Sequence, residues 1–180
     1  MALNTPMRAI MVAAARVAMI AAMIAATGAG PVAAGQNHPP VFGYLEKALL
    51  MPSRFPIKAK LDTGADNSSI HAQVTAEFER NGKPWIAFDV ESVDGRKIGF
   101  ERQVIRTVRI KRHAGESQRR PVVRLTFCVG DIARDVEVNL VNRAKLKYNL
   151  LIGRSFMAGQ LLVDSALKFT TEPTCTRGVQ

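Results

Sequence analysis

From Val41 onward the chain alternates between short apolar and polar runs separated by turn-forming residues, and helical periodicity is rare. An alternation with a period of two is typical of strands that bury one face. The run Val122–Val129 shows it most clearly, because every second side chain is large and apolar. These positions are Val123, Leu125, Phe127 and Val129.

The same pattern predicts an all-β domain with short connections. Asp94-Gly95 between two alternating runs predicts a hairpin, and Gly130-Asp131 predicts another turn. Ala76–Asn81 is predicted as a brief helical turn or a loop, and Arg154–Ala158 as a short helical turn. The further strands expected are Lys58–Leu61, Ile70–Ala72, Trp85–Val90, Lys97–Val104, Asp135–Val141, Leu150–Ile152, Leu161–Asp164 and Leu167–Thr170.

The first 34 residues have a different composition from the rest. They contain no acidic residue, and Arg8 and Arg16 precede the apolar run Val17–Ala26. Small residues follow up to Ala34. A basic start, an apolar segment of about ten residues and a small-residue exit are typical of a secretory signal peptide. We therefore expect cleavage before Gly35 and a periplasmic or secreted protein; the alternative is an uncleaved anchor. Residues 35–40 form a polar linker.

Composition narrows the functional classes. The 180 residues include 25 Lys and Arg against 15 Asp and Glu, a formal net charge of +10, and the hydrophobic share of 47% indicates a folded chain. There is no phosphate-binding GxxxxGK[ST] or GxGxxG motif. The three histidines lack the spacing of a zinc hydrolase. We expect no metal and no cofactor.

Asp62-Thr63-Gly64-Ala65 is the motif that carries chemistry. It puts a carboxylate at the end of an apolar strand, on a tight turn where Gly64 lets a substrate backbone approach closely. Thr63 can lock the turn through its hydroxyl. A DTG tripeptide alone is also compatible with an ordinary Asx turn. The apolar strand before it and the Leu-Leu-Ile-Gly153-Arg154 run about ninety residues later favour the catalytic interpretation.

This pair of motifs resembles the retropepsins, the single-lobe aspartic peptidases of retroviral type. The wider pattern is similar to a bacterial retropepsin-like family whose members are often labelled ATP-dependent zinc proteases and are associated with glutamate-ligase-like proteins. The resemblance implies a closed or semi-closed β-barrel over residues 41–172, followed by a tail, 173–180. The matching stretches are Lys58–Ala65, Ser68–Ala72, Gln118–Val123, Leu151–Phe156 and Leu162–Asp164.

The chemistry of such a peptidase constrains its assembly. Two carboxylates must share one proton, because like charges about 3 Å apart cannot both ionise. The chain has one DTG turn, and Asp164 lacks the residues that would shape a second, so a structural role is favoured for it. We therefore expect a homodimer in which each subunit contributes Asp62.

Several other residues have both a functional and a plain interpretation. If the two motifs converge, as the resemblance implies, Asp66 and Arg154 form a partly buried pair next to Gly153; otherwise they are separate solvated charges. For His71, a structural or solvated role is favoured over a ligand. The hairpin Glu91–Lys97 is either a flap over a bound peptide or an ordinary surface hairpin. Cys128 and Cys175 are either a disulfide that fastens the tail or two thiols.

A basic block between Arg102 and Arg124 is compatible with a solvated face or with anionic partners. It lacks aromatic stacking residues, so nucleic acid is not expected; acidic peptides or anionic envelope polymers fit better. The function predicted is an exported aspartic endopeptidase that acts on peptide or protein substrates. The alternatives are a non-catalytic peptide-binding module and a cell-envelope accessory protein. The block comprises Arg102, Arg106, Arg109, Lys111, Arg112, Arg119, Arg120 and Arg124.

Overall fold

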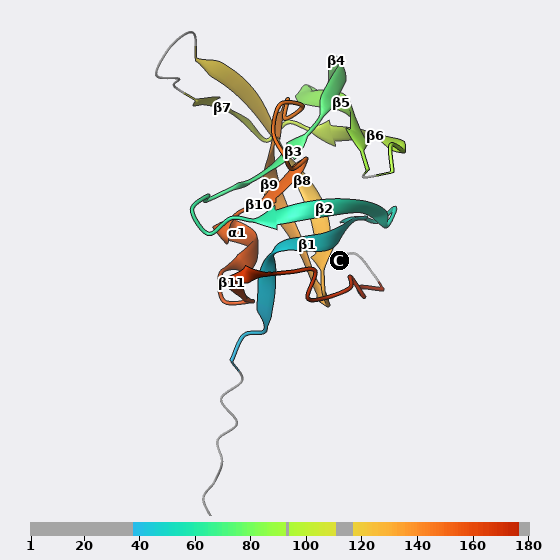
Figure 1. Cartoon of the computed structure of the whole chain (residues 1–180). Helices are drawn as coiled ribbons and strands as arrows, with labels where there is room; N and C mark the ends of the chain where they lie inside the picture. The colour runs from blue at the N-terminus through green and yellow to red at the C-terminus, as the bar shows by residue number, and fades with distance from the viewer. Residues whose placement is uncertain (1–37, 93, 111–116, 177–180) are drawn as a thin grey trace, which may run out of the picture. The chain divides into compact units, whose positions relative to one another are not determined.

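Six strands close into a barrel, which confirms the predicted all-β architecture (Figure 1). The computed structural model describes residues 38–92, 94–110 and 117–176, so the predicted signal peptide lies outside the described residues. The first strand pairs with β8 and completes the ring. In order around the barrel the strands are β1 (Val41–Met51), β2 (Phe55–Leu61), β10 (Leu150–Ile152), β3 (Ser68–His71), β9 (Ile132–Val141) and β8 (Gln118–Val129).

Five further strands and one helical turn extend this barrel. One strand, β11 (Leu162–Lys168), runs parallel to β1, and β7 (Arg106–Ile110) pairs with the outer part of β8. A separate three-stranded sheet consists of β4 (Gln73–Arg80), β5 (Lys83–Glu91) and β6 (Lys97–Gln103). The helical turn α1 (Arg154–Met157) follows β10, as predicted. None of the described helical residues forms a segment that could cross a membrane.

Burial alternates along β2, and this determines the side of the strand on which Asp62 lies. Its buried side chains are Phe55, Ile57, Ala59 and Leu61, whereas Lys58 is exposed and Lys60 half-buried. The predicted apolar face of β8 also lies in the main core, together with Phe88 and Phe100 of the three-stranded sheet. Because side chains alternate across a strand, Asp62 continues on the same side of β2 as Lys58 and Lys60.

Two predicted elements differ in the structure. Ala76–Asn81, expected as a helical turn or a loop, belongs largely to β4, because Asn81 and Gly82 form a two-residue hairpin loop to β5. Both have a positive φ, 53° and 69°, as this type of tight turn requires. The two closing strands expected in 161–170 are one strand, β11, whose pairing with β1 is interrupted by a register shift.

Among the contacts that fasten residues 169–175 to the barrel are a disulfide and a buried glutamate. A disulfide joins Cys128 of β8 to Cys175. The Glu46 side chain is fully buried, and its Oε1 accepts hydrogen bonds from the backbone N–H of Gly43 (2.7 Å), the backbone N–H of Thr170 (3.0 Å) and the Thr170 hydroxyl (2.6 Å). Oε2 lies 3.4 Å from the Thr171 nitrogen, which donates to it. Glu46 was not among the residues singled out in the sequence.

Candidate active site

Asp62 lies immediately after β2, where the strand passes into the DTG turn. Its backbone N–H donates to the Ile152 carbonyl (2.9 Å), so the start of the turn is fixed to β10, which runs parallel to β2. The Ala65 N–H donates back to the Asp62 carbonyl (3.2 Å) and closes the turn. The backbone on both sides of the carboxylate is therefore held by hydrogen bonds.

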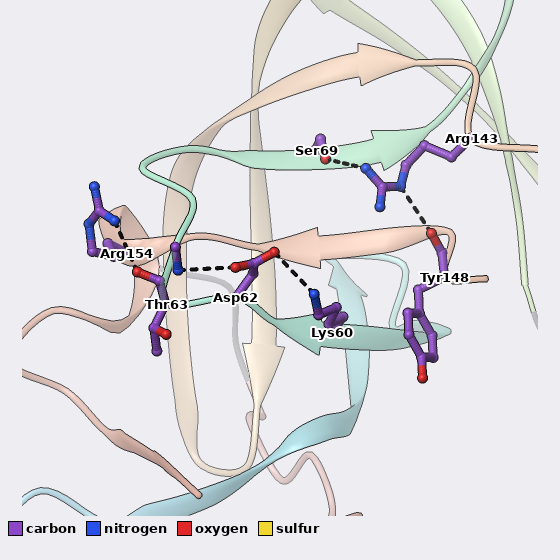
Figure 2. Close-up of polar contacts among 8 residues, drawn as sticks. Lys60, Asp62, Thr63, Ser69, Arg143, Tyr148 and Arg154 are labelled. Atoms are coloured by element: carbon purple, nitrogen blue, oxygen red, sulfur yellow. Dashed lines mark hydrogen bonds and ion pairs between the residues drawn. The ribbon is translucent and has the colours of Figure 1, made fainter. Parts of the chain in front are cut away.

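Among the described residues the Asp62 carboxylate has one donor on each oxygen, and it remains accessible (Figure 2). The Gly64 N–H donates to Oδ1 (3.0 Å), and the Lys60 ammonium lies 3.3 Å from Oδ2. A quarter of the side chain is exposed. A Cβ at Gly64 would lie 3.3 Å from Oδ1, so the glycine keeps the space beside the carboxylate clear. A carboxylate accepts up to about four hydrogen bonds, which leaves room for a water or a second acid.

The second motif meets the first, as the resemblance implied. The Arg154 N–H donates to the Ala65 carbonyl (2.8 Å) and the Ser155 N–H to the Asp66 carbonyl (3.0 Å). Gly153 is required at this contact, because a Cβ there would lie 2.7 Å from backbone atoms of Asn67. Thr63 takes part through its backbone carbonyl, which accepts from Arg154 Nη1 (2.9 Å), whereas a hydroxyl contact was expected.

Asp66 and Arg154 form an ion pair between Oδ1 and Nη2. The pair is more exposed than expected, since the side chains are 77% and 49% accessible, and the guanidinium divides its donors between Asp66 and Thr63. An exposed pair of this kind stabilises a protein by roughly 0–1 kcal/mol. The convergence of the turns therefore depends mainly on their backbone hydrogen bonds and on Gly153.

Arg143 is a buried cation near the site that sequence reasoning missed. Its Nη1 donates to the Ser69 hydroxyl (2.8 Å) and its Nε to the Tyr148 carbonyl (2.9 Å), as Figure 2 shows. Burial lowers the pKa of the Arg143 guanidinium, the positive charge of Arg120 adds to this, and the negative charge of Asp62 works in the opposite direction. A lone arginine after a strand carries no sequence signal for this role.

The remaining candidates lie in structural positions. His71 accepts the Arg143 backbone N–H at Nδ1 (2.8 Å), which fits the structural role favoured for it. Asp164 lies on β11, and its Oδ1 accepts the Ala166 N–H (2.8 Å).

At the tip of the β5–β6 hairpin, the Arg96 guanidinium lies 6.0 Å from the centre of the Phe55 ring at the start of β2. The tip therefore lies over the end of β2 opposite to Asp62.

The basic block is partly neutralised by acids of β9. Arg106 lies 2.7 Å from Glu137, and Arg124 lies 3.1 Å from Asp135. Lys111 and Arg112 lie outside the described residues.

The residues around Asp62 do not fit a zinc ion. Lys60 pairs with this carboxylate and the charge of Arg143 interacts with it, and both are cations that would repel a metal. In the part of the chain that the structure describes, no three His, Cys, Asp or Glu side chains lie close enough together to bind one.

Comparison with known proteins identifies the family. Residues 41–174 match the family model described as RimB-like, retropepsin-like aspartic endopeptidase RimB. The chain belongs to this family. The match covers the whole barrel, including both turns of the candidate site.

Relatives of the RimB-like domain occur in longer proteins. A probable alpha-L-glutamate ligase of Shewanella pealeana is 39% identical over 116 residues, which are 63% of this chain and 25% of the relative. A protein of the same name from Desulfotalea psychrophila is 36% identical over 115 residues, 62% of this chain and 25% of the relative. The chain thus spans about a quarter of these curated relatives.

A solved structure has the same fold. The crystal structure of Lpg0085 from Legionella pneumophila, a protein of unknown function (DUF785), superposes with a TM-score of 0.65 at 39% identity. The match covers 75% of this chain and 100% of that one.

Proposed function

We propose that this RimB-like protein is an aspartic endopeptidase whose active form is a homodimer. The observation that carries the proposal is the Asp62 carboxylate, which lies on a backbone-fixed turn, with one donor on each oxygen and an open side. Since the described chain has one such turn, a second Asp62 from another subunit supplies the second acid. Membership of a retropepsin-like endopeptidase family supports this assembly.

In this mechanism the two Asp62 carboxyls share one proton. The ionised carboxyl accepts a proton from a water, whose oxygen adds to the scissile carbonyl carbon, while the protonated carboxyl hydrogen-bonds to the carbonyl oxygen. The tetrahedral intermediate collapses as the C–N bond breaks, and a proton passes from the dyad to the leaving nitrogen. The products are a carboxylic acid and an amine, and the dyad regains its single proton.

The substrate class we propose is an acidic peptide. The relatives named probable alpha-L-glutamate ligase carry a domain similar to this one, and a protein that joins glutamate residues makes an acidic product. The cations Lys60 and Arg143 beside Asp62 would attract such a chain.

We also propose that the protein is exported and that the signal peptide is removed. The acid-free, apolar amino terminus supports export, and so does the Cys128–Cys175 disulfide, because disulfides persist in oxidising compartments. Mass spectrometry of the envelope fraction should find a mature amino terminus near Gly35. Intact Met1 in the cytoplasmic fraction would contradict this proposal.

The decisive experiment replaces the acid. Asp62→Asn keeps size and most hydrogen bonding but removes the titratable proton, and loss of an acid–base group typically costs about 10²–10⁴-fold in rate. Cleavage of an acidic peptide library, followed by mass spectrometry, should be lost, whereas the matched Asp164→Asn control should retain it. Excess Asp62→Asn subunit should suppress the wild type, because mixed dimers lack one acid.

Inhibitors distinguish this mechanism from its rivals. A pepstatin-like compound should stop cleavage and a chelator should not. Cleavage that survives in Asp62→Asn, or that only a chelator stops, would overturn the aspartic dyad. Binding of peptides without cleavage by the wild type would favour a non-catalytic module.

A further inference from the structure

A cavity of about 460 Å³ opens beside β2, and Lys58 on its exposed side is one of the lining residues. Its walls come from β1, β2, the end of β5, the segment that leads into β10, and the end of β11. Three lysines, Lys58, Lys147 and Lys168, line it together with Tyr44 and Tyr148. None of its lining residues belongs to the Asp62–Ala65 turn.

Each lysine is held against an aromatic ring. The Lys58 ammonium lies 5.8 Å from the centre of the Phe169 ring, that of Lys147 lies 5.6 Å from Tyr148, and that of Lys168 lies 5.5 Å from Tyr44. These cation–π contacts position the ammonium groups at the wall without neutralising them. Lys168 also lowers the pKa of the Tyr44 phenol, chiefly by hydrogen bonding and to a smaller extent by its charge.

The cavity is electrostatically unbalanced. Glu91 is the acid among its lining residues, against three lysines, and its carboxylate lies 3.9 Å from Lys97, which is outside the lining. Leu45 and Ile57 add apolar surface. Positive groups around a partly apolar wall match an acid on a short aliphatic stem, such as the side chain of glutamate.

The geometry connects this cavity to Asp62. Lys58, Lys60 and Asp62 occupy alternate positions on one side of β2, so Lys58 is about 13 Å from Asp62 at roughly 3.3 Å per residue. Tyr148 leads directly into β10, whose Ile152 carbonyl accepts the Asp62 N–H. An extended peptide with its scissile bond at Asp62 would place a side chain three or four residues away in the cavity.

We propose that the cavity lined by Lys58, Lys147 and Lys168 is a subsite for one acidic side chain of the substrate, three or four residues from the scissile bond. This inference rests on the proposed function. The overall charge of +10 would attract an acidic residue at any position of the peptide. The subsite adds recognition of an acidic residue at one particular position.

Binding to the Asp62→Asn protein tests the subsite without requiring cleavage. The probes are fluorescein-labelled ten-residue peptides with a single Glu at each position in turn, and their Gln counterparts. At low salt we expect one or two neighbouring positions at which Glu binds about three- to tenfold tighter than Gln. Lys58→Gln and Lys168→Gln should abolish this difference. Lys83→Gln should preserve it, because Lys83 lies outside the lining, at the opposite end of β5 from Glu91.

The outcomes separate the two proposals. A Glu preference that is the same at every position, or that Lys83→Gln weakens as much as Lys58→Gln does, would overturn the subsite in favour of long-range attraction. A local preference in Asp62→Asn, combined with no cleavage by the wild type, would support the subsite and overturn the peptidase. Cleavage that is indifferent to Glu or Gln at every position would support the peptidase and overturn the subsite.

Discussion

Glu46 lies on β1 and Asp62 directly follows the adjacent strand β2, and the surroundings of these two acids differ in kind. Glu46 is fully buried and accepts three hydrogen bonds on one oxygen and one on the other. Asp62 is a quarter exposed and has one donor on each oxygen. A buried acid that is hydrogen-bonded within the protein stabilises a fold, whereas an accessible acid with free acceptor capacity can bind a water or transfer a proton.

The largest expected effect is on stability, and it tests the distinction between a structural acid, Glu46, and a functional acid, Asp62. Glu46→Leu should lower the free energy of unfolding by about 3 kcal/mol, because it leaves the donors of Gly43, Thr170 and Thr171 unpaired in the interior. Asp62→Asn should change it by less than about 0.5 kcal/mol while abolishing cleavage. Urea unfolding of both variants measures the contrast.

Glu46→Gln serves as the control for shape, since one oxygen is retained, and it should cost less than the leucine. Equal stability losses for Glu46→Leu and Asp62→Asn would refute the distinction between a structural and a functional acid.

The features predicted from sequence were those carried by short, local patterns. The Asp62 turn, the Gly153-Arg154 run and the alternating face of β8 each lie within a few residues of chain, and each occupies the expected element. Ala76–Asn81 was predicted as a helical turn or a loop, because β4 is exposed along most of its length and so shows no alternating burial.

Long-range contacts could not be predicted in the same way. Glu46 meets Thr170 across 124 residues, and Arg143 meets Ser69 across 74. Neither pair has a spacing or composition that distinguishes it from surface residues. The burial of these charged groups depends on which strands close the barrel, so they could be identified only once the strand order was known.

A smaller effect is expected for the ion pair between Asp66 and Arg154. A double-mutant cycle with alanine should give a coupling of roughly 0.2–1 kcal/mol that falls as salt is added, because both side chains are largely exposed. Arg154→Ala alone should cost more than Asp66→Ala, since it also removes the hydrogen bond to the Thr63 carbonyl. A coupling of several kcal/mol would indicate that the pair becomes buried, for example at a subunit contact.

The smallest effect concerns Asp94, at the tip of the β5–β6 hairpin. Its hydrogen bonds with the Ser92 hydroxyl and then with Arg96 lower its pKa from the ordinary 3.8 to about 2. A carboxyl whose pKa is lower in the folded state stabilises that state above its unfolded pKa, and the contribution disappears as the pH falls through the folded pKa. The hairpin tip should therefore loosen between about pH 4 and pH 2, which NMR titration of the Asp94 carboxyl carbon would detect as a midpoint near 2. Ser92→Ala should move that midpoint upward, because it removes the largest cause of the shift, and a midpoint of 3.8 in the unmodified protein would contradict the hydrogen-bonded tip.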